Sequence, residues 1–259
     1  MQITVEQIRF FHLNGFLRIE SPVATPEEIE WMRAAYDRMF AERAGWNSGD
    51  QFDLGGTDEK GKSEALPQIL NPAKYAPELN DGKFLVVVDQ IVKQLLGDEA
   101  EVGIAHAIFK PSGHGAATPW HQDEAYWDPK FQYKTISVWM PLQPATIENG
   151  CLWFVPGSHE WDVLPHQSIG GDVRVHGLEM VNTEPCETAV ACPLPAGGIT
   201  IHRNRTAHYA GPNTSDIPRR ALIMMGGLPQ TDNPAARNFP WNEIKQTARA
   251  EREKLAKTS

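Results

Sequence analysis

Cysteine is scarce in this 259-residue chain, which contains only Cys151, Cys186 and Cys192. An odd number of cysteines without a paired spacing does not resemble the disulfide framework of a small secreted protein. The chain also lacks the ~20 consecutive apolar residues of a membrane-spanning helix, and its N-terminus, residues 1–8, lacks a basic segment followed by an apolar one. We therefore expect a cytoplasmic protein that does not associate with membranes.

Positive charge is in deficit too, since 24 Lys and Arg residues are outnumbered by 33 Asp and Glu residues, giving a net charge of -9. Non-specific binding to nucleic acid or to an anionic membrane needs clustered positive charge. Only residues 245–257 are locally basic, and we interpret them as the solvated end of a helix. We expect a small-molecule substrate as the partner, and no nucleic acid.

The bulk composition, with 41% hydrophobic and 22% charged residues, is that of a globular protein. All-β barrels with accessory helices often reach this length as one domain, so we expect a single domain over residues 1–259. Its expected parts are a helical N-terminal region over residues 1–100, a β core over residues 101–230 and a C-terminal helix over residues 240–258.

Capping residues predict where the first two helices begin. Thr4 with Gln7 is a capping box, and that helix is expected to end at Gly15. Thr25 with Glu28 predicts a second helix, and apolar spacing predicts a third over residues 84–96. Residues 45–63 are rich in Gly, Asp and Ser and show neither period, so they are either a mobile lid or a surface loop.

From residue 102 onward, short apolar or alternating runs separated by Pro and Gly predict strands and a β-barrel or sandwich. These runs cover residues 106–110, 135–142, 151–155, 198–202 and 221–225. Within residues 135–142 every second side chain is aliphatic. Because side chains alternate across a strand, Trp139 is expected on the face opposite to the aliphatic set.

One short motif suggests a metal site. His121 and Asp123 form the chain's only His-x-Asp triplet, which is a weak signal by itself. On an extended strand, residues two apart point to the same side, so both side chains can reach one cation. A second histidine downstream would complete a facial triad, and the candidates are His202 and His208. We favour His208, because His202 ends an apolar strand while His208 lies in the segment that follows.

A facial triad leaves coordination positions open for an anionic cosubstrate and for dioxygen. If a dicarboxylate chelated the metal through one end, its other carboxylate would be buried and would need a partner, for which a guanidinium is suited. Arg219, eleven residues after His208, opens a predicted strand, and Arg220 is its rival. Strand alternation allows only one of the two arginines to face inward.

Several motifs together carry a family resemblance. They are Asn14-Gly15-Phe16, residues 108–111, residues 119–123, residues 148–159, and the order His202, His208, Asn213 and Arg219. The sequence resembles the phytanoyl-CoA dioxygenase family, within the jelly-roll (double-stranded β-helix) superfamily of iron(II)- and 2-oxoglutarate-dependent oxygenases. Residues 148–159 are especially similar to the branch called phytanoyl-CoA dioxygenase domain-containing proteins.

The resemblance implies roles for individual residues. His121, Asp123 and His208 match the iron ligands of the family, and Arg219 matches the partner of the distal carboxylate of 2-oxoglutarate. Trp139 matches a tryptophan that lines the cosubstrate pocket.

Two more residues are implied as cosubstrate contacts. Lys110 and His106 share a strand face, and His106 stands where a methionine contacts 2-oxoglutarate in the similar branch. Ala210 departs from the family, which commonly has serine there, so one hydrogen bond to the cosubstrate is either lost or supplied by another residue. Tyr126 and Trp127, with Trp161, are candidates for a substrate pocket or are ordinary core aromatics.

The implied reaction uses Fe(II), 2-oxoglutarate and O2, releases succinate and CO2, and hydroxylates an unactivated C–H bond of a small or medium organic metabolite. Desaturation or ring closure would use the same residues. Related halogenases replace the carboxylate ligand by a small residue, so Asp123 argues against halogenation. The alternative from another class is a cupin-like metal-binding protein without redox activity, in which Arg219 and Trp139 would have no evident role.

Overall fold

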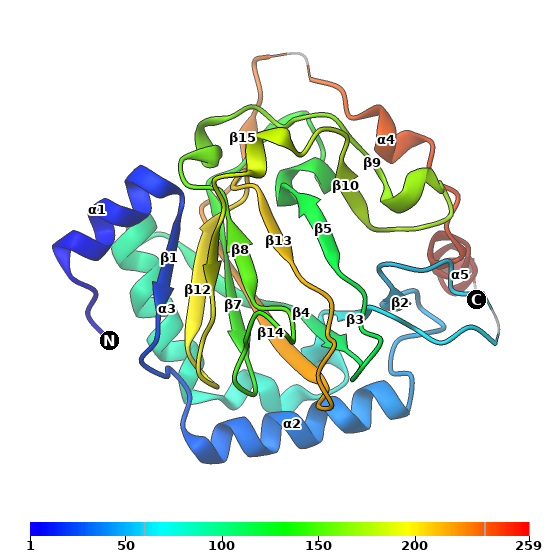
Figure 1. Ribbon diagram of the computed structural model, residues 1–259, viewed down its shortest axis with the longest axis horizontal. Helices are drawn as coiled ribbons and strands as arrows, with labels where there is room; N and C mark the ends of the chain where they lie inside the picture. The colour runs from blue at the N-terminus through cyan, green and yellow to red at the C-terminus, as the bar shows by residue number, and fades with distance from the viewer. Residues whose placement is uncertain (60, 236, 259) are drawn as a thin grey trace.

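Two antiparallel sheets form the core of the computed structural model, which describes residues 1–59, 61–235 and 237–258 (Figure 1). The major sheet has, in spatial order, β1 (Phe16–Ile19), β12 (Ile199–Arg203), β7 (Thr135–Pro141), β14 (Arg219–Gly227), β4 (Glu101–Lys110), β3 (Pro67–Leu70) and β2 (Gln51–Asp53). The minor sheet has β11 (Val190–Cys192), β8 (Leu152–Phe154), β13 (His208–Ala210) and β5 (Thr118–His121). This pair of sheets is the predicted jelly roll.

Smaller elements complete the described part of the chain. Two further strand pairs are β9 (His166–Ser168) with β10 (Leu178–Met180), and β6 (Phe131–Gln132) with β15 (Thr231–Asp232). Short 3-10 turns are η1 (Pro72–Lys74), η2 (Pro77–Asp81), η3 (Asp123–Tyr126), η4 (Ser158–Glu160), η5 (Ile169–Gly171) and η6 (Glu184–Cys186).

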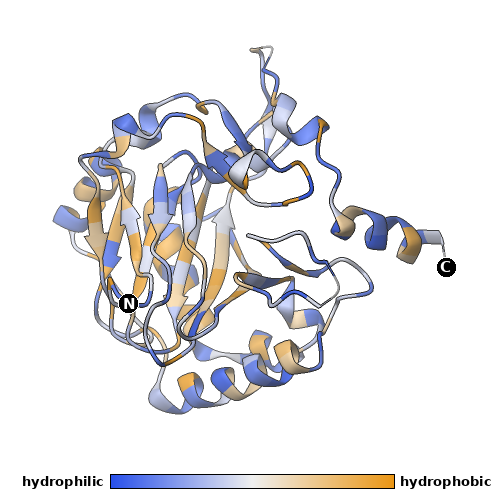
Figure 2. Cartoon of the chain, turned by 45° about the vertical axis from the view of Figure 1, so that its right-hand side comes forward, coloured by the Kyte–Doolittle hydropathy of each residue, from blue (hydrophilic) through white to orange (hydrophobic). Residues whose placement is uncertain are grey.

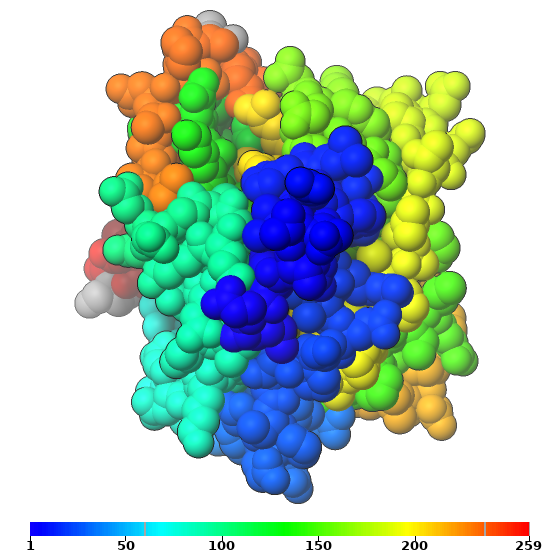
Figure 3. All heavy atoms as spheres, turned by 90° about the vertical axis from the view of Figure 1, so that its left-hand side faces the viewer, coloured from blue at the N-terminus to red at the C-terminus, as the bar shows by residue number. Residues whose placement is uncertain are grey.

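Three helices cover the outer face of the major sheet. They are α1 (Val5–Asn14), α2 (Pro26–Ala41) and α3 (Lys83–Leu96), and they lie together on the side shown in Figure 3. The capping boxes at Thr4 and Thr25 are both present, and Gly15 ends α1 with a φ of 80°, which favours glycine. The three predicted helices are therefore confirmed.

Strand alternation divides the buried side chains of the major sheet into two groups. On β7, Ile136, Val138 and Met140 pack against the helices, while Trp139 belongs to the cluster between the two sheets. The predicted orientation of Trp139 is confirmed. Figure 2 shows the apolar residues concentrated along these strands and the polar residues on the outer helices and loops.

The N-terminal hundred residues are less purely helical than the sequence indicated. β1 pairs with β12, so Phe16 to Ile19 form an edge strand of the core, and β2 and β3 extend the opposite edge. Residues 45–59 and 61–63 contain β2 and ordered turns, with Asp53 accepting hydrogen bonds from the backbone N–H groups of Gly55, Ala65 and Leu66. Residue 60, which falls in the predicted lid or loop, lies outside the described residues.

The C-terminal helix is also different from the prediction. The segment is split into α4 (Pro240–Glu243) and α5 (Ala248–Thr258), because Thr247 leaves the helical pattern and its Oγ1 accepts from the N–H of Ala250 at 3.2 Å. Its basic residues are only partly a solvated helix end: Lys257 is 73% exposed, whereas Arg252 donates to the backbone of Trp46 and Gln51, and its side chain is only 16% exposed.

None of the helices in the described ranges is both long and apolar enough to cross a membrane. The three cysteines are buried and free.

Candidate active site

Three side chains with metal-ligating atoms meet where β5 of the minor sheet ends and β13 begins. His121 ends β5, Asp123 begins η3, and His208 begins β13, whose pairing with β5 puts His208 directly opposite His121. One ligand atom from each residue lies within 4.8 Å of the others. The distances to Asp123 Oδ1 are 3.7 Å from His121 Nε2 and 3.6 Å from His208 Nε2.

Hydrogen bonds fix the tautomers of both histidines. Nδ1 of His121 lies 2.8 Å from the carbonyl of Pro119, and Nδ1 of His208 lies 2.9 Å from that of Thr206. Since a carbonyl oxygen can only accept, each ring carries its proton on Nδ1 and presents the lone pair of Nε2 to the site. Burial lowers the pKa of both rings, that of His208 well below its usual value. Both imidazoles are therefore neutral at neutral pH and can offer the Nε2 lone pair to a metal.

Asp123 divides its two oxygens between different partners. Oδ2 accepts from Ser137 Oγ at 2.7 Å and lies 3.3 Å from His202 Nε2, while Oδ1 faces the other two histidines. Burial acts to raise the pKa of Asp123, but His208, His202 and His121 outweigh it, so the pKa is lowered. His202 therefore contacts the far oxygen of the carboxylate, and the open set is two imidazole nitrogens and one carboxylate oxygen.

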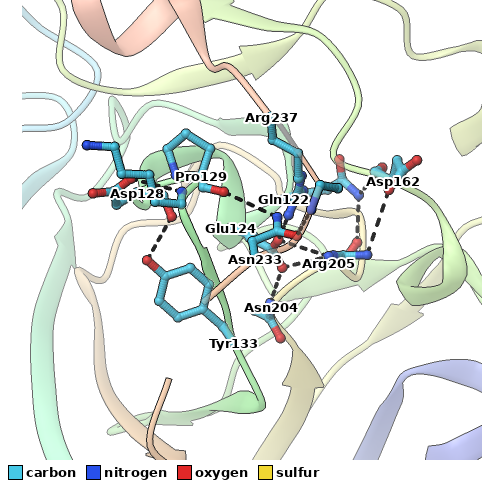
Figure 4. Close-up of polar contacts among 12 residues, drawn as sticks. Gln122, Glu124, Asp128, Pro129, Tyr133, Asp162, Asn204, Arg205, Asn233 and Arg237 are labelled. Atoms are coloured by element: carbon cyan, nitrogen blue, oxygen red, sulfur yellow. Dashed lines mark hydrogen bonds and ion pairs between the residues drawn. The ribbon is translucent and has the colours of Figure 1, made fainter. Parts of the chain in front are cut away.

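Glu124, the residue after Asp123, anchors η3 through charge pairs (Figure 4). Its side chain is 1% exposed and accepts from Arg205 Nε at 2.9 Å and from Arg237 Nη1 at 2.6 Å. Asn204 Nδ2 donates to the same carboxylate, and the N–H of Glu124 donates to the carbonyl of Asn204 at 3.0 Å. A buried carboxylate is stable only when it is paired in this way, so the turn that carries Asp123 is held from two other segments of the chain.

A second part of the site surrounds Arg219, which is 1% exposed at the start of β14. Its Nε and Nη1 are buried without a hydrogen-bond partner, and burial lowers its pKa to about 10. Arg220 faces the opposite way, where its Nε donates to Asp37 at 2.8 Å. Arg219 is thus the inward-facing arginine of the two, and the Trp139 ring lies 5.4 Å from its guanidinium carbon.

Lys110 adds a second cation beside Arg219, its register partner on β4. Its ammonium donates to the carbonyls of Ala210 and Gly211 at 3.1 and 2.5 Å. Burial, then Arg219, lowers the pKa of Lys110 well below its usual value. Within the described ranges no carboxylate pairs with either side chain, so this end of the site is short of negative charge.

A cavity of about 220 Å³ connects the two parts. Its lining includes all three candidate metal ligands and five more of the predicted residues, which are Arg219, Trp139, His106, Tyr126 and Trp127. Lys110 is not part of the lining, and Trp161 packs in a separate apolar cluster. The cosubstrate contacts predicted for Lys110 and His106 therefore remain predictions.

Thr118 is a lining residue that the sequence analysis missed. It lies directly opposite Ala210 in the pairing of β5 with β13, and its side chain faces the cavity. Its hydroxyl is a candidate for the cosubstrate hydrogen bond that serine commonly supplies at the position of Ala210. Only the strand register reveals this, because Thr118 and Ala210 are far apart in sequence.

Both halves of the site suit the groups that they would hold. Two neutral imidazoles and one carboxylate on one face are the ligand set of non-haem iron(II), with positions left open. The buried, unpartnered Nε and Nη1 of Arg219 suit a carboxylate that reaches the cationic end of the cavity. A jelly roll with this combination defines the class of iron(II)- and 2-oxoglutarate-dependent oxygenases.

Comparison with known proteins gives the family within that class. The sequence profile of phytanoyl-CoA dioxygenase (PhyH) matches residues 11–221. The chain belongs to the phytanoyl-CoA dioxygenase family.

Among curated relatives, a probable alpha-ketoglutarate-dependent hypophosphite dioxygenase of Stutzerimonas stutzeri is 27% identical over 62% of this chain and 57% of its own length. Phytanoyl-CoA dioxygenase domain-containing protein 1 of Rattus norvegicus is 28% identical over 68% of this chain and 65% of its own length. The chain thus matches less than two thirds of these relatives.

A solved structure is similar over most of both chains. EvdO2 from Micromonospora carbonacea var. aurantiaca is 40% identical with a TM-score of 0.80, and the match covers 93% of this chain and 97% of EvdO2. A second EvdO2 structure, with a TM-score of 0.79, is a complex with 2-oxoglutarate.

Proposed function

We propose that the protein is an iron(II)- and 2-oxoglutarate-dependent dioxygenase that hydroxylates an unactivated C–H bond of a small or medium organic metabolite. The reaction consumes O2 and converts 2-oxoglutarate to succinate and CO2. The observation that carries this proposal is the shared cavity, in which an open His-Asp-His set and the unpartnered guanidinium of Arg219 face one space. A cytoplasmic location and a single domain over residues 1–259 belong to the same proposal.

In this reaction His121, Asp123 and His208 would hold the iron. Iron with 2-oxoglutarate and O2 supplies the oxidising chemistry when bound, and the protein supplies position and surroundings. The Nδ1–H bonds to backbone carbonyls keep Nε2 of both imidazoles facing Oδ1 of Asp123, and Ser137 keeps Oδ2 of Asp123 occupied. Oδ1 would then be the carboxylate oxygen that holds the iron.

Arg219 would bind the distal carboxylate of 2-oxoglutarate, with Trp139 along one side of the cosubstrate and the hydroxyl of Thr118 as a further donor. Lys110 holds the backbone of Ala210 and Gly211, two and three residues beyond His208, and so keeps this strand against β4. Its positive charge also favours an anion at this end of the cavity.

Asp123 separates the proposed hydroxylation from halogenation, because a carboxylate occupies the position that a halide would need. The proposal also differs from a metal-binding barrel without redox activity. Such a barrel would gain nothing from a buried and unpartnered arginine, whose desolvation is costly unless a ligand pairs with it.

The test is aerobic incubation of the purified protein with iron(II), ascorbate and 2-oxoglutarate, followed by measurement of succinate. Succinate is expected with iron(II) and not with zinc(II), and a suitable metabolite should raise the yield. A protein that binds iron(II) at the His-Asp-His set and still forms no succinate would be the non-redox alternative.

A further inference from the structure

One side of the cavity carries polar side chains that neither the metal ligands nor Arg219 use. Gln68 on β3, His106 on β4 and His176, just before β10, all line the cavity. No hydrogen bond joins the side-chain atoms of these three residues to the described part of the protein, and the Nδ1 of His176 is fully buried without a partner. Buried polar groups are almost always paired, so groups left free along a cavity wall point to a ligand.

These residues lie away from the cosubstrate end. Along β14, the strand next to β4, the register partner of His106 is Ile223, whereas the partner of Lys110 is Arg219. Four residues of extended strand separate the two positions by roughly 13 Å. His106 on β4 lies directly opposite Leu70 on β3. Gln68, two residues before Leu70, is on the same face of β3.

His176 comes from the segment before β10, and its ring is held by aromatic neighbours. Phe52 approaches it edge-on with ring centroids 4.7 Å apart, and Tyr126 stacks on it at 6.1 Å. The ammonium of Lys245 donates to the carbonyl of His176 at 2.8 Å from outside the cavity lining. His176 is therefore fixed in place although its ring nitrogens have no partner.

The charge state of this wall restricts the ligand. Burial lowers the pKa of His106, and burial with Lys245 and Arg249 lowers that of His176 well below its usual value, so both imidazoles are neutral at neutral pH. A neutral imidazole and an amide can each both donate and accept hydrogen bonds, as a hydroxyl group can. The charged lining residues are Asp123 and Arg219, which the metal and the cosubstrate would occupy.

We propose that Gln68, His106 and His176 form the substrate subsite and that it selects a neutral, hydroxyl-bearing metabolite over carboxylates, phosphates and coenzyme A esters. This inference rests on the proposed function. The hydroxyl groups of the substrate would bind the three polar side chains, while Tyr126, Leu54 and Leu70 contact its carbon skeleton. The C–H bond that reacts would then face the iron ligands.

The experiment compares succinate release with a panel of matched probes. The neutral set is methyl β-glucopyranoside, myo-inositol, trans-1,2-cyclohexanediol and phenethyl alcohol, and the anionic set is their phosphate esters together with decanoyl-CoA. Only neutral probes are expected to raise succinate release above the rate without substrate. Stimulation confined to anionic probes, or by none of the neutral ones, overturns the proposal.

Variants then test the residues. Gln68→Leu and His176→Phe should each raise the KM for a stimulating probe about tenfold, because each leaves a substrate hydroxyl without its partner. The control His114→Phe changes an exposed histidine outside the cavity and should leave the KM unchanged. Unfolding temperatures show whether each variant folds, and an unchanged KM in folded Gln68→Leu and His176→Phe overturns the assignment.

His106 distinguishes the substrate subsite from the cosubstrate site. If it binds substrate, His106→Phe raises the KM for the probe; if it binds 2-oxoglutarate, the same change raises the concentration of 2-oxoglutarate needed for half-saturation and contradicts its place in the subsite. Absence of the charge-transfer band of anaerobic iron(II) with 2-oxoglutarate in the unmodified protein would count against the proposed function itself, and against this inference with it.

Discussion

Replacing Arg219 by alanine is expected to weaken 2-oxoglutarate binding by at least about a hundredfold. The side chain is 1% exposed and two of its nitrogens have no protein partner, so its removal leaves the distal carboxylate of the cosubstrate buried without a guanidinium. Breaking a buried charge pair on one side costs roughly 3–5 kcal/mol, and each ~1.4 kcal/mol is a factor of ten in affinity.

Because of Lys110, we expect the binding free energy lost in Arg219→Ala to lie toward the lower end of this range. Its ammonium lies at the same end of the site and keeps some positive charge there, although two carbonyls already occupy it. Arg219→Lys should recover part of the affinity, because the charge returns without the two-pronged geometry of the guanidinium.

Without cosubstrate, the charge of Arg219 destabilises the folded protein. Burial disfavours its charged form and lowers its pKa to about 10, so at neutral pH the unpaired charge costs stability. Arg219→Met should therefore not lower the unfolding temperature in the absence of 2-oxoglutarate, and added 2-oxoglutarate should raise that temperature much less than in the unmodified protein.

The affinity is measured by titrating 2-oxoglutarate into the anaerobic iron(II) protein and following the metal-to-ligand charge-transfer absorbance. Arg220→Ala is the matched control, because that side chain faces outward and pairs with the 55% exposed Asp37. Equal affinity in the unmodified protein and in Arg219→Ala would refute the assignment of the cosubstrate site.

Three other predictions concern the metal site. His208→Ala should abolish iron binding and succinate formation. His202→Ala should keep iron binding with reduced affinity, since His202 contacts only the second oxygen of Asp123. The reverse result in an iron-binding titration would exchange the roles of the two histidines. Asp123→Gly should abolish hydroxylation by opening a ligand position, and undiminished product in a mass-spectrometric assay would remove this carboxylate from the ligand set. Arg237→Ala should lower the unfolding temperature by several degrees, since it strips one partner from the buried carboxylate of Glu124, and Glu124→Gln in the same chain should reverse part of that loss. Independent, additive effects of these two changes on the unfolding temperature would contradict the pairing.

Features of the fold that depend on local chemistry could be predicted from the sequence. A capping box joins residues three apart, so Thr4 and Thr25 mark helix starts without any knowledge of the tertiary structure. The period of a strand is equally local, and it placed Trp139 on the inner face and left Arg219 and Arg220 on opposite faces.

Features that depend on distant segments could not be predicted. Glu124 is paired with Arg205 and Arg237, which come from separate parts of the chain, and no spacing rule connects them. The helix expected over residues 240–258 failed for a related reason. Trp241 packs in an apolar cluster with Ala125, Arg252 donates to the backbone of Trp46 and Gln51, and Thr247 caps the second of two pieces.

The two sides of the cavity also differ in where their supporting residues lie along the chain. The three candidate metal ligands and Arg219 all fall within residues 11–221, the region that the family profile matches. Beyond that region, Trp241 Nε1 donates to the carbonyl of Ala125 at 2.9 Å, and Lys245 donates to that of His176 at 2.8 Å. These contacts position Tyr126 and His176 on the proposed substrate side, so the C-terminal segment helps to shape that side. Gln68, His106 and His176 themselves lie within the family match, so the proposed substrate side combines residues inside the match with supporting contacts from beyond it.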